Sequence, residues 1–222
     1  MDKIFAIYKP KGPTSYDMIR KIKKEIGNDI KIGHAGTLDP LASGILVIAI
    51  GGATKNISEE VAKEKEYIAK IKLGVRSSTD DEEGEKTRST NYELRINIEE
   101  IEKVLKIFIG KIQQVPPVYS ALKINGKEAY KRMRSGEVIE MKSREVEIKS
   151  IDVLTYDWPF LVIKVITGPG VYIRSLARDI GEKLGVWGYM SDLERTRVGD
   201  FTKENAIEIS DIKNIFGVDK TL

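Results

Sequence analysis

The sequence predicts a fold that mixes β-strands and α-helices, and three segments carry this prediction. Residues 45–50 form an apolar, largely β-branched run closed by two glycines, which is typical of a strand buried on both faces. Residues 67–73 alternate between apolar and polar side chains, as a half-buried strand does. Residues 15–27 place apolar side chains on one face, which indicates an amphipathic helix. Strands and helices are therefore expected to alternate along one compact domain.

The remaining elements follow from local start and stop signals. The first helix can be capped by Thr14 or Ser15, and Gly27 is expected to end it. Each later strand or helix is likewise bounded by glycine, proline or a polar run. The expected elements are a helix over 55–63, a polar loop or hairpin tip over 77–90, a helix over 98–109, a strand over 161–167 and, after a glycine turn, a helix that ends near 184.

Composition narrows the chemistry. The 222 residues include no cysteine and one histidine, which excludes thiolate catalysis, zinc–thiolate sites and a multi-histidine metal site within one chain. No apolar run approaches the length of a membrane span, and the short apolar start before Lys9 does not look like a secretory signal. We therefore expect a soluble cytoplasmic protein that binds no membrane and no metal, and whose catalytic groups are carboxylates, hydroxyls, amines or backbone atoms.

Charge is segregated along the chain although the net charge is only +3. Residues 1–35 hold eight Lys or Arg against four Asp or Glu, and residues 111–149 hold nine against five, whereas residues 77–102 hold three against nine. This pattern suits a protein that directs two basic segments toward a phosphate backbone while the acidic segment faces elsewhere. Solvated surfaces also cluster charge by chance, so the pattern alone leaves RNA binding open.

The loop over residues 33–44 is the candidate for chemistry. It contains three glycines, which permit backbone angles and close approaches that other residues resist, and Pro40 restricts Asp39 to extended conformations. A carboxylate on a constrained loop beside a buried strand is held firmly, as functional side chains often are. A turn in which Asp39 only satisfies nearby amides is the alternative. The local residues by themselves allow both interpretations.

Six motifs in order along nearly the whole chain resemble those of the bacterial tRNA pseudouridine-55 synthases of the TruB type. These motifs are Lys9 to Ser15, Gly33 to Gly44, Lys65 to Tyr67, Val115 to Lys123, Gly170 to Leu176 and Asp192 to Thr196. The resemblance implies an α+β pseudouridine synthase core, in which a curved, mainly antiparallel sheet is flanked by helices and crossed by a central catalytic cleft. It implies one catalytic domain over residues 1–222, with a basic RNA-gripping insertion at about 115–145. The tail from Phe201 is too short for the family's full C-terminal RNA-binding domain, which we expect to be absent.

The resemblance also implies an activity, namely isomerisation of uridine to pseudouridine at position 55 in the T arm of tRNA. Base flipping would expose the target, and no cofactor would be needed. The expected partner is the T-arm stem-loop of tRNA, bound by a monomer. Asp39 occupies the position of the family's nucleophile, and a nearby positive charge would keep it ionised in a closed pocket. Whether Asp39 attacks C6 of the base or C1′ of the ribose is left open.

The other expected site residues are carried over from the same motifs. Arg174 matches the arginine that pairs with the nucleophile, and Tyr67 matches the tyrosine that stacks on the uracil and can help to remove the C5 proton. Tyr172 and Leu193 match residues that line the pocket, and His34 matches a histidine that contacts RNA beside the flipped base. The expected phosphate contacts are Lys9, Lys123, Lys131 and Arg132.

Two other function classes remain open at this point. An RNA-binding or RNA-folding protein would need the basic segments but not Asp39, Tyr67 and Arg174 together. A nucleoside hydrolase could use the same carboxylate, but it would release free uracil.

Overall fold

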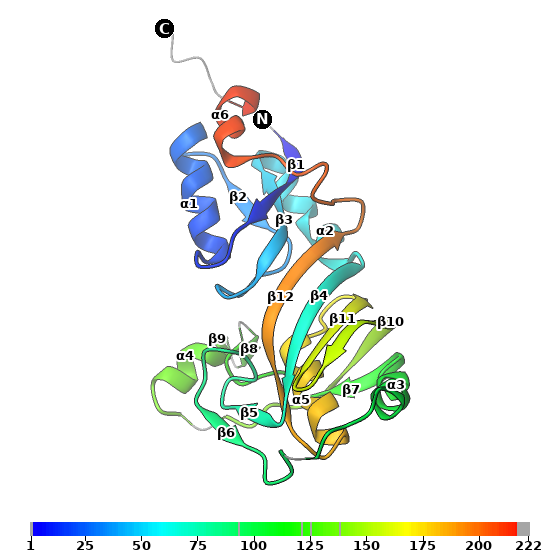
Figure 1. Ribbon diagram of the computed structural model, residues 1–222. Helices are drawn as coiled ribbons and strands as arrows, with labels where there is room; N and C mark the ends of the chain where they lie inside the picture. Colours follow the sequence, from blue (N-terminus) through cyan, green and yellow to red (C-terminus); the bar gives the residue numbers. More distant parts are fainter. Residues whose placement is uncertain (1, 93, 121, 125, 138, 217–222) are drawn as a thin grey trace, which may run out of the picture. The chain divides into compact units, whose positions relative to one another are not determined.

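The computed structural model describes residues 2–92, 94–120, 122–124, 126–137 and 139–216 (Figure 1). The chain divides into two compact units, the first formed by Met1–Tyr67 with Glu194–Leu222 and the second by Ile68–Leu193. Two long strands, β4 (Lys65–Leu73) and β12 (Gly188–Val198), contribute residues to both units. The single catalytic domain without a full C-terminal RNA-binding domain, as expected from the sequence, stays a prediction.

The first unit is a small sheet covered by helices. Strand β3 (Ser43–Ile50) pairs antiparallel with β1 (Lys3–Lys9) and with β2 (Ile32–His34). It also pairs in parallel with β12 at Glu194 and Arg195. All of β3 is buried, which confirms the predicted buried strand. Helices α1 (Ser15–Ile26) and α6 (Ile209–Phe216) contact each other, and a short 3₁₀ helix, η1 (Gly51–Asn56), leads into α2 (Ile57–Ala62).

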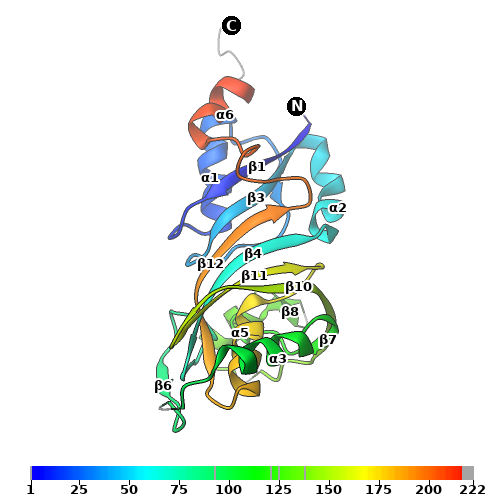
Figure 2. The ribbon, with the colours of Figure 1, turned by 45° about the vertical axis from the view of Figure 1, so that its right-hand side comes forward.

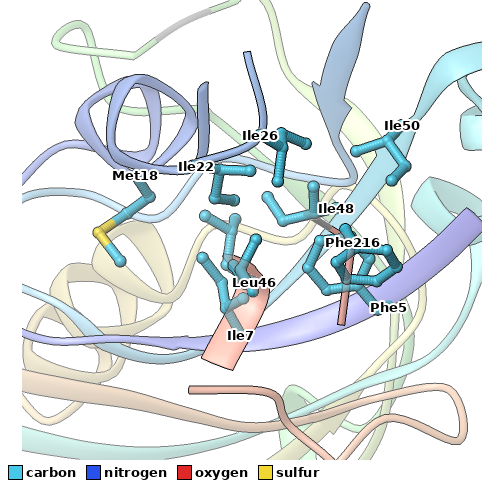
Figure 3. Packing of buried hydrophobic residues seen from close by; sticks show 10 residues of the cluster. Phe5, Ile7, Met18, Ile22, Ile26, Leu46, Ile48, Ile50 and Phe216 are labelled. Atoms are coloured by element: carbon cyan, nitrogen blue, oxygen red, sulfur yellow. The ribbon is translucent and has the colours of Figure 1, made fainter. Parts of the chain in front are cut away.

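Helix α1 has the boundaries that its sequence predicts. Thr14 caps it, its side chain accepting from the Asp17 amide at 3.0 Å. Gly27 ends the helix with φ of +109°. The apolar face packs on the sheet, because burying side chains such as these contributes about 1.5–3 kcal/mol each. Figure 3 shows this core, which contains Phe5, Ile7, Met18, Ile22, Ile26, Leu46, Ile48, Ile50, Ile212 and Phe216.

The second unit contains a larger sheet with the strand order β12, β4, β11 (Phe160–Thr167), β10 (Arg144–Asp157) and β7 (Gly110–Gln114). Strand β10 is antiparallel to both of its neighbours. Figure 2 shows the strands curving past α5 (Ile173–Lys183) and α3 (Ile98–Ile107). Two short strand pairs and one short helix complete the unit: β5 (Val75–Ser77) with β6 (Lys86–Arg88), β8 (Lys123–Ile124) with β9 (Lys127–Glu128), and α4 (Ala129–Arg134).

The α+β class with a mainly antiparallel sheet flanked by helices is confirmed, and so is the hairpin around the polar segment 77–90. Several predicted boundaries were wrong by a few residues. The strand expected from Tyr67 begins at Lys65, the helix expected over 55–63 spans only Ile57–Ala62, and the helix expected to reach 109 ends at Ile107. Strand β2 was not predicted, because three residues are too few to show a period. In the part of the chain that the structure describes, no helix is long and apolar enough to span a membrane.

Candidate catalytic site

The Asp39 loop connects β2 to β3, and the N-terminal motif holds it from one side. The Ser15 hydroxyl donates to the Leu38 carbonyl at 3.0 Å and accepts from the Leu38 amide at 2.9 Å. The Gly12 amide donates to the carbonyl of Pro40 at 2.8 Å. These bonds lie on both sides of Asp39, whose own carbonyl accepts from the Ala42 amide at 3.1 Å. The half-buried Asp39 is therefore carried by a backbone that is fixed before and after it.

Lys9 is a buried cation in the electrostatic neighbourhood of Asp39. Its side chain is fully buried, and its ammonium group donates to the carbonyls of Pro10 and Pro13, each at 2.9 Å. Burial lowers the pKa of Lys9 to about 8, the Asp39 carboxylate opposes this shift, and Arg195 adds to it. In this structure the ammonium group is bonded to its own chain, and the expected contact of Lys9 with an RNA phosphate stays a prediction.

Arg195 is a member of this site that the sequence analysis did not select. Its side chain is only 2% exposed, and the guanidinium donates to the carbonyl of Ile45 at 2.8 Å and to that of Gly36 at 3.1 Å. Burial lowers the pKa of Arg195, while its interaction with the Tyr67 side chain opposes the shift. The available signal was its place in the last motif, on a strand where alternate residues, Leu193 and Arg195, point inward.

Gly44 allows Arg195 to reach this position. It has φ of +118°, and a Cβ atom there would lie 2.1 Å from the Arg195 carbonyl oxygen, much closer than atoms can approach. Strand β12 can therefore pair with β3 at Gly44 only because no side chain is present. The glycine that the sequence marked as conformationally permissive is required for close contact between two strands.

His34 and Tyr67 belong to the same cluster in the first unit. His34 is half-buried at the end of β2, and its pKa is lowered by burial and then by the charge of Arg195, which favours a neutral imidazole. Tyr67 is 6% exposed on the inward face of β4. The first unit thus brings Lys9, His34 and Tyr67 around the buried Arg195, with Asp39 interacting with Lys9. Burial, and then the charge of Arg195, also lowers the pKa of Lys65.

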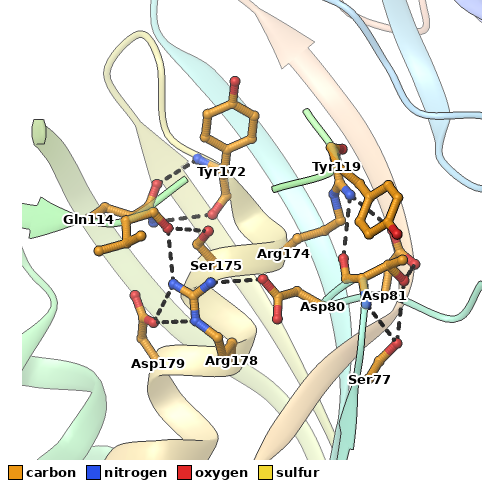
Figure 4. Close-up of polar contacts among 12 residues, drawn as sticks. Ser77, Asp80, Asp81, Gln114, Tyr119, Tyr172, Arg174, Ser175, Arg178 and Asp179 are labelled. Atoms are coloured by element: carbon orange, nitrogen blue, oxygen red, sulfur yellow. Dashed lines mark hydrogen bonds and ion pairs between the residues drawn. The ribbon is translucent and has the colours of Figure 1, made fainter. Parts of the chain in front are cut away.

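Arg174 lies in the first turn of α5, in the second unit (Figure 4). It forms an ion pair with Asp81 at 3.1 Å, and the two side chains are 7% and 4% exposed. It also donates to the Tyr119 carbonyl at 2.9 Å. Asp39 and Arg174 belong to different units, so their predicted pairing stays a prediction. Asp81 belongs to the acidic segment 77–102, and its buried charge is paired with that of Arg174, which lies in neither of the two basic segments.

A second arginine of α5 extends this polar network. Arg178 donates to Asp80 at 2.8 Å, to Asp179 at 2.9 Å and to the carbonyl of Val115 at 3.0 Å (Figure 4). Burial raises the pKa of Asp80 and of Asp179, and the nearby Arg178 opposes both shifts. The loop between β5 and β6 is therefore attached to α5 by two neighbouring carboxylates, each with its own arginine.

The remaining predicted residues fall in the second unit. Tyr172 directly precedes α5, and Leu193 is 7% exposed on β12. In the predicted insertion, Lys123 begins β8 and Lys131 lies in α4, but their side chains are outside the described residues. The Arg132 Nε donates to Glu137 at 2.7 Å, and a second guanidinium nitrogen pairs with the same carboxylate. Its charge is therefore shared with Glu137 in this structure.

Comparisons with known proteins agree with the motifs. The family model described as the N-terminal domain of TruB pseudouridylate synthases matches residues 20–173, and the one described as the tRNA pseudouridylate synthase B C-terminal domain matches residues 174–221. A tRNA pseudouridine synthase B of Clostridium tetani is 43% identical over 96% of this chain and 73% of its own length. That of Parabacteroides distasonis is 42% identical over 95% of this chain and 91% of its own length.

The solved structures point the same way. The Cbf5 complex with Nop10 and Gar1 matches with a TM-score of 0.70 and 32% identity, covering 95% of this chain and 53% of that chain. An H/ACA ribonucleoprotein bound to a substrate RNA containing 2′-deoxyuridine matches with a TM-score of 0.69 and 28% identity, covering 98% of this chain and 56% of that chain. The chain thus spans about half the length of these structures. With two family models and curated relatives matched over nearly all of its residues, it belongs to the TruB family of pseudouridylate synthases, which are isomerases.

Proposed function

We propose that this chain converts uridine to pseudouridine at position 55, in the T arm of tRNA, with Asp39 as the nucleophile. Family membership supports the reaction, and the names of its curated relatives support tRNA as the substrate. The observation that carries the proposal is the cluster in the first unit. There a carboxylate on a fixed loop shares an electrostatic neighbourhood with buried Lys9 and Arg195 and with an inward-facing tyrosine.

The reaction is an isomerisation, and its atoms balance without a cofactor. The bond from N1 of uracil to C1′ of the ribose breaks, the uracil turns, and a bond from C5 to C1′ forms while the C5 proton leaves and N1 takes up a proton. Asp39 attacks as a carboxylate and later departs, either at C6 or at C1′, as carboxylate nucleophiles do at sugar carbons. Positive groups around Asp39, with Arg174 assigned as its partner, keep the carboxylate ionised although the pocket is closed to water.

The base must leave its stack before Asp39 can reach it, at a cost of about a few kcal/mol. Tyr67 stacks on the extruded uracil and is the candidate to help remove the C5 proton. Tyr172 and Leu193 line the pocket and exclude water from the detached base. His34, as a neutral ring, contacts the RNA beside the vacated position. Lys123, Lys131 and Arg132 of the basic segment contact phosphates, and the protein acts as a monomer.

The test uses an unmodified T-arm stem-loop that contains the target uridine. Pseudouridine is detected by carbodiimide treatment followed by reverse transcription, which stops at the modified position. We expect a stop at the one T-loop uridine with the wild-type chain and with Asp29→Asn, an exposed aspartate of the same unit. We expect none with Asp39→Asn, which is similar in size and should still bind the RNA.

Each alternative has its own signature in this assay. Substantial turnover by Asp39→Asn would remove Asp39 from the nucleophile role. Binding by the wild-type chain without any stop would contradict the isomerase and favour an RNA-binding protein. Release of free uracil would favour a nucleoside hydrolase.

A further inference from the structure

Gln114 and Arg144 face each other at the base of the segment 115–143, the part of the chain expected to grip RNA. Strand β7 ends at Gln114 and strand β10 begins at Arg144, and these residues are direct partners in the antiparallel register. The chain leaves the sheet after Gln114 and returns to it at Arg144. This pair is therefore the point at which both ends of the segment join the sheet of the second unit.

Gln114 holds Tyr172, the residue directly before helix α5. Its side chain is fully buried, and the amide nitrogen donates to the Tyr172 carbonyl at 3.1 Å while the amide oxygen accepts from the Tyr172 N–H at 2.8 Å (Figure 4). Tyr172 is the N-cap of α5, and its own side chain makes no capping hydrogen bond. The two bonds fix the backbone just ahead of Arg174.

Arg144 contacts the aromatic ring of the same tyrosine. The guanidinium carbon lies 4.9 Å from the centre of the Tyr172 ring, a distance at which cation and ring attract each other. The guanidinium also donates to the carbonyl of Gly170, two residues earlier. Gln114 thus sets the backbone of Tyr172 and Arg144 sets the direction of its ring, from the two ends of one segment.

The first residues of the segment are bonded to α5 as well. The carbonyl of Val115 accepts from the Ser175 hydroxyl at 2.8 Å and from Arg178 at 3.0 Å. The Tyr119 carbonyl accepts from Arg174 at 2.9 Å. A displacement of this end of the segment would therefore reach the first turn of α5 directly, including Arg174.

We propose that Gln114 and Arg144 are positioning residues that couple the 115–143 segment to Tyr172 and Arg174. This inference rests on the proposed function, in which the segment grips RNA and these two residues belong to the uracil pocket. When the segment binds RNA, its ends are held in place, and the bonds of Gln114 and Arg144 to Tyr172 then fix the start of α5. This orients Tyr172 and Arg174 for the reaction. Arg144 acts through Tyr172 rather than by contacting the reacting base.

The test compares Arg144→Lys with Arg76→Lys. Lysine keeps the charge but lacks the planar face and the fork of donors that arginine offers. Arg76 is a matched control, because its guanidinium lies 4.6 Å from the centre of the Trp187 ring, outside the proposed site. At saturating stem-loop RNA, Arg144→Lys should lower the single-turnover rate by about tenfold or more with little change in the Kd for RNA. Arg76→Lys should match the wild type in both.

A double-variant cycle separates positioning from phosphate contact. In a Tyr172→Leu background, Arg144→Lys should cause little further loss of rate, because both changes remove the same interaction. Independent, multiplicative losses would contradict the proposal. A weaker Kd for RNA at an unchanged saturated rate would show that Arg144 contacts the RNA itself and would also overturn the proposal.

Hydrogen exchange of the free protein gives a readout that needs no turnover. The amides of residues 172–178 should exchange faster in Arg144→Lys than in the wild type, and Arg76→Lys should not change them. Equal exchange in all three proteins would overturn the proposal. Failure of the proposed function would be seen separately, as a wild-type chain that binds the stem-loop but produces no pseudouridine.

Discussion

The ion pair between Arg174 and Asp81 allows a stability prediction for the second unit. The two side chains are 7% and 4% exposed and lie 3.1 Å apart. Removing one partner of a buried pair typically costs about 3–5 kcal/mol, because it leaves a charge without compensation. In Asp81→Asn the amide oxygen can still accept a hydrogen bond from Arg174. Arg174 also keeps its hydrogen bond to the Tyr119 carbonyl, at 2.9 Å. We therefore expect a loss of about 2–3 kcal/mol, which for a chain of this size lowers Tm by roughly 4–12 °C.

Asp80→Asn is the matched control for this change. Asp80 pairs with Arg178 at 2.8 Å, but these side chains are 16% and 22% exposed, and Arg178 also pairs with Asp179. The control should lose less than about 1 kcal/mol. Urea unfolding followed by tryptophan fluorescence reports on the second unit, because both tryptophans, Trp158 and Trp187, belong to it. Equal losses for the two variants, or no loss for Asp81→Asn, would refute the reasoning from burial.

Other predictions concern pH, packing and RNA binding. Lys9 and Lys65 each have a pKa of about 8 in the folded chain, against 10.5 for a lysine exposed to water. The unfolded chain therefore binds more protons between about pH 8 and pH 10, so the urea midpoint should rise with pH there, and replacing either lysine by methionine should flatten the rise. A flat wild-type profile would contradict these shifts. Gly44→Ala should cost more than about 3 kcal/mol, measured by urea unfolding, because its Cβ would meet the backbone of β12. Glu137→Gln should release Arg132, tighten RNA binding and steepen its salt dependence, and an unchanged slope would place Arg132 away from RNA.

Local pattern was sufficient to predict many elements of the fold. The cap at Thr14, the apolar face of α1 and the stop at Gly27 gave both helix boundaries, because they depend on residues within one or two turns. The alternation in β4 and the uninterrupted burial of β3 were likewise visible as periods in the sequence. Short or irregular elements such as β2 were missed, since their conformation depends on the strand with which they pair.

Some residues of the candidate site could likewise be identified from the sequence, and others only from the structure. The motifs identified Asp39, His34 and Tyr67, and the structure gathers these residues in the first unit. Arg195 was missed because an arginine on a strand is ordinarily solvated, and its burial depends on residues far away in the sequence. Asp81 looked like part of a solvated acidic run for the same reason, although its partner Arg174 lies on α5.

The sequence by itself thus determined the residue types of the site, the constrained loop under Asp39 and the family, because these depend on local backbone preferences and on ordered motifs. Only the tertiary structure decided which charges are buried and what they contact. Arg195 is buried because β12 pairs with β3 beside Gly44. The ammonium group of Lys9 donates to two backbone carbonyls of its own chain. Gln114 and Arg144 met on Tyr172 only because β7 and β10 are in register. The physical reason is that a charged side chain loses its water only when distant segments enclose it, and such enclosure leaves no periodic signal in the sequence.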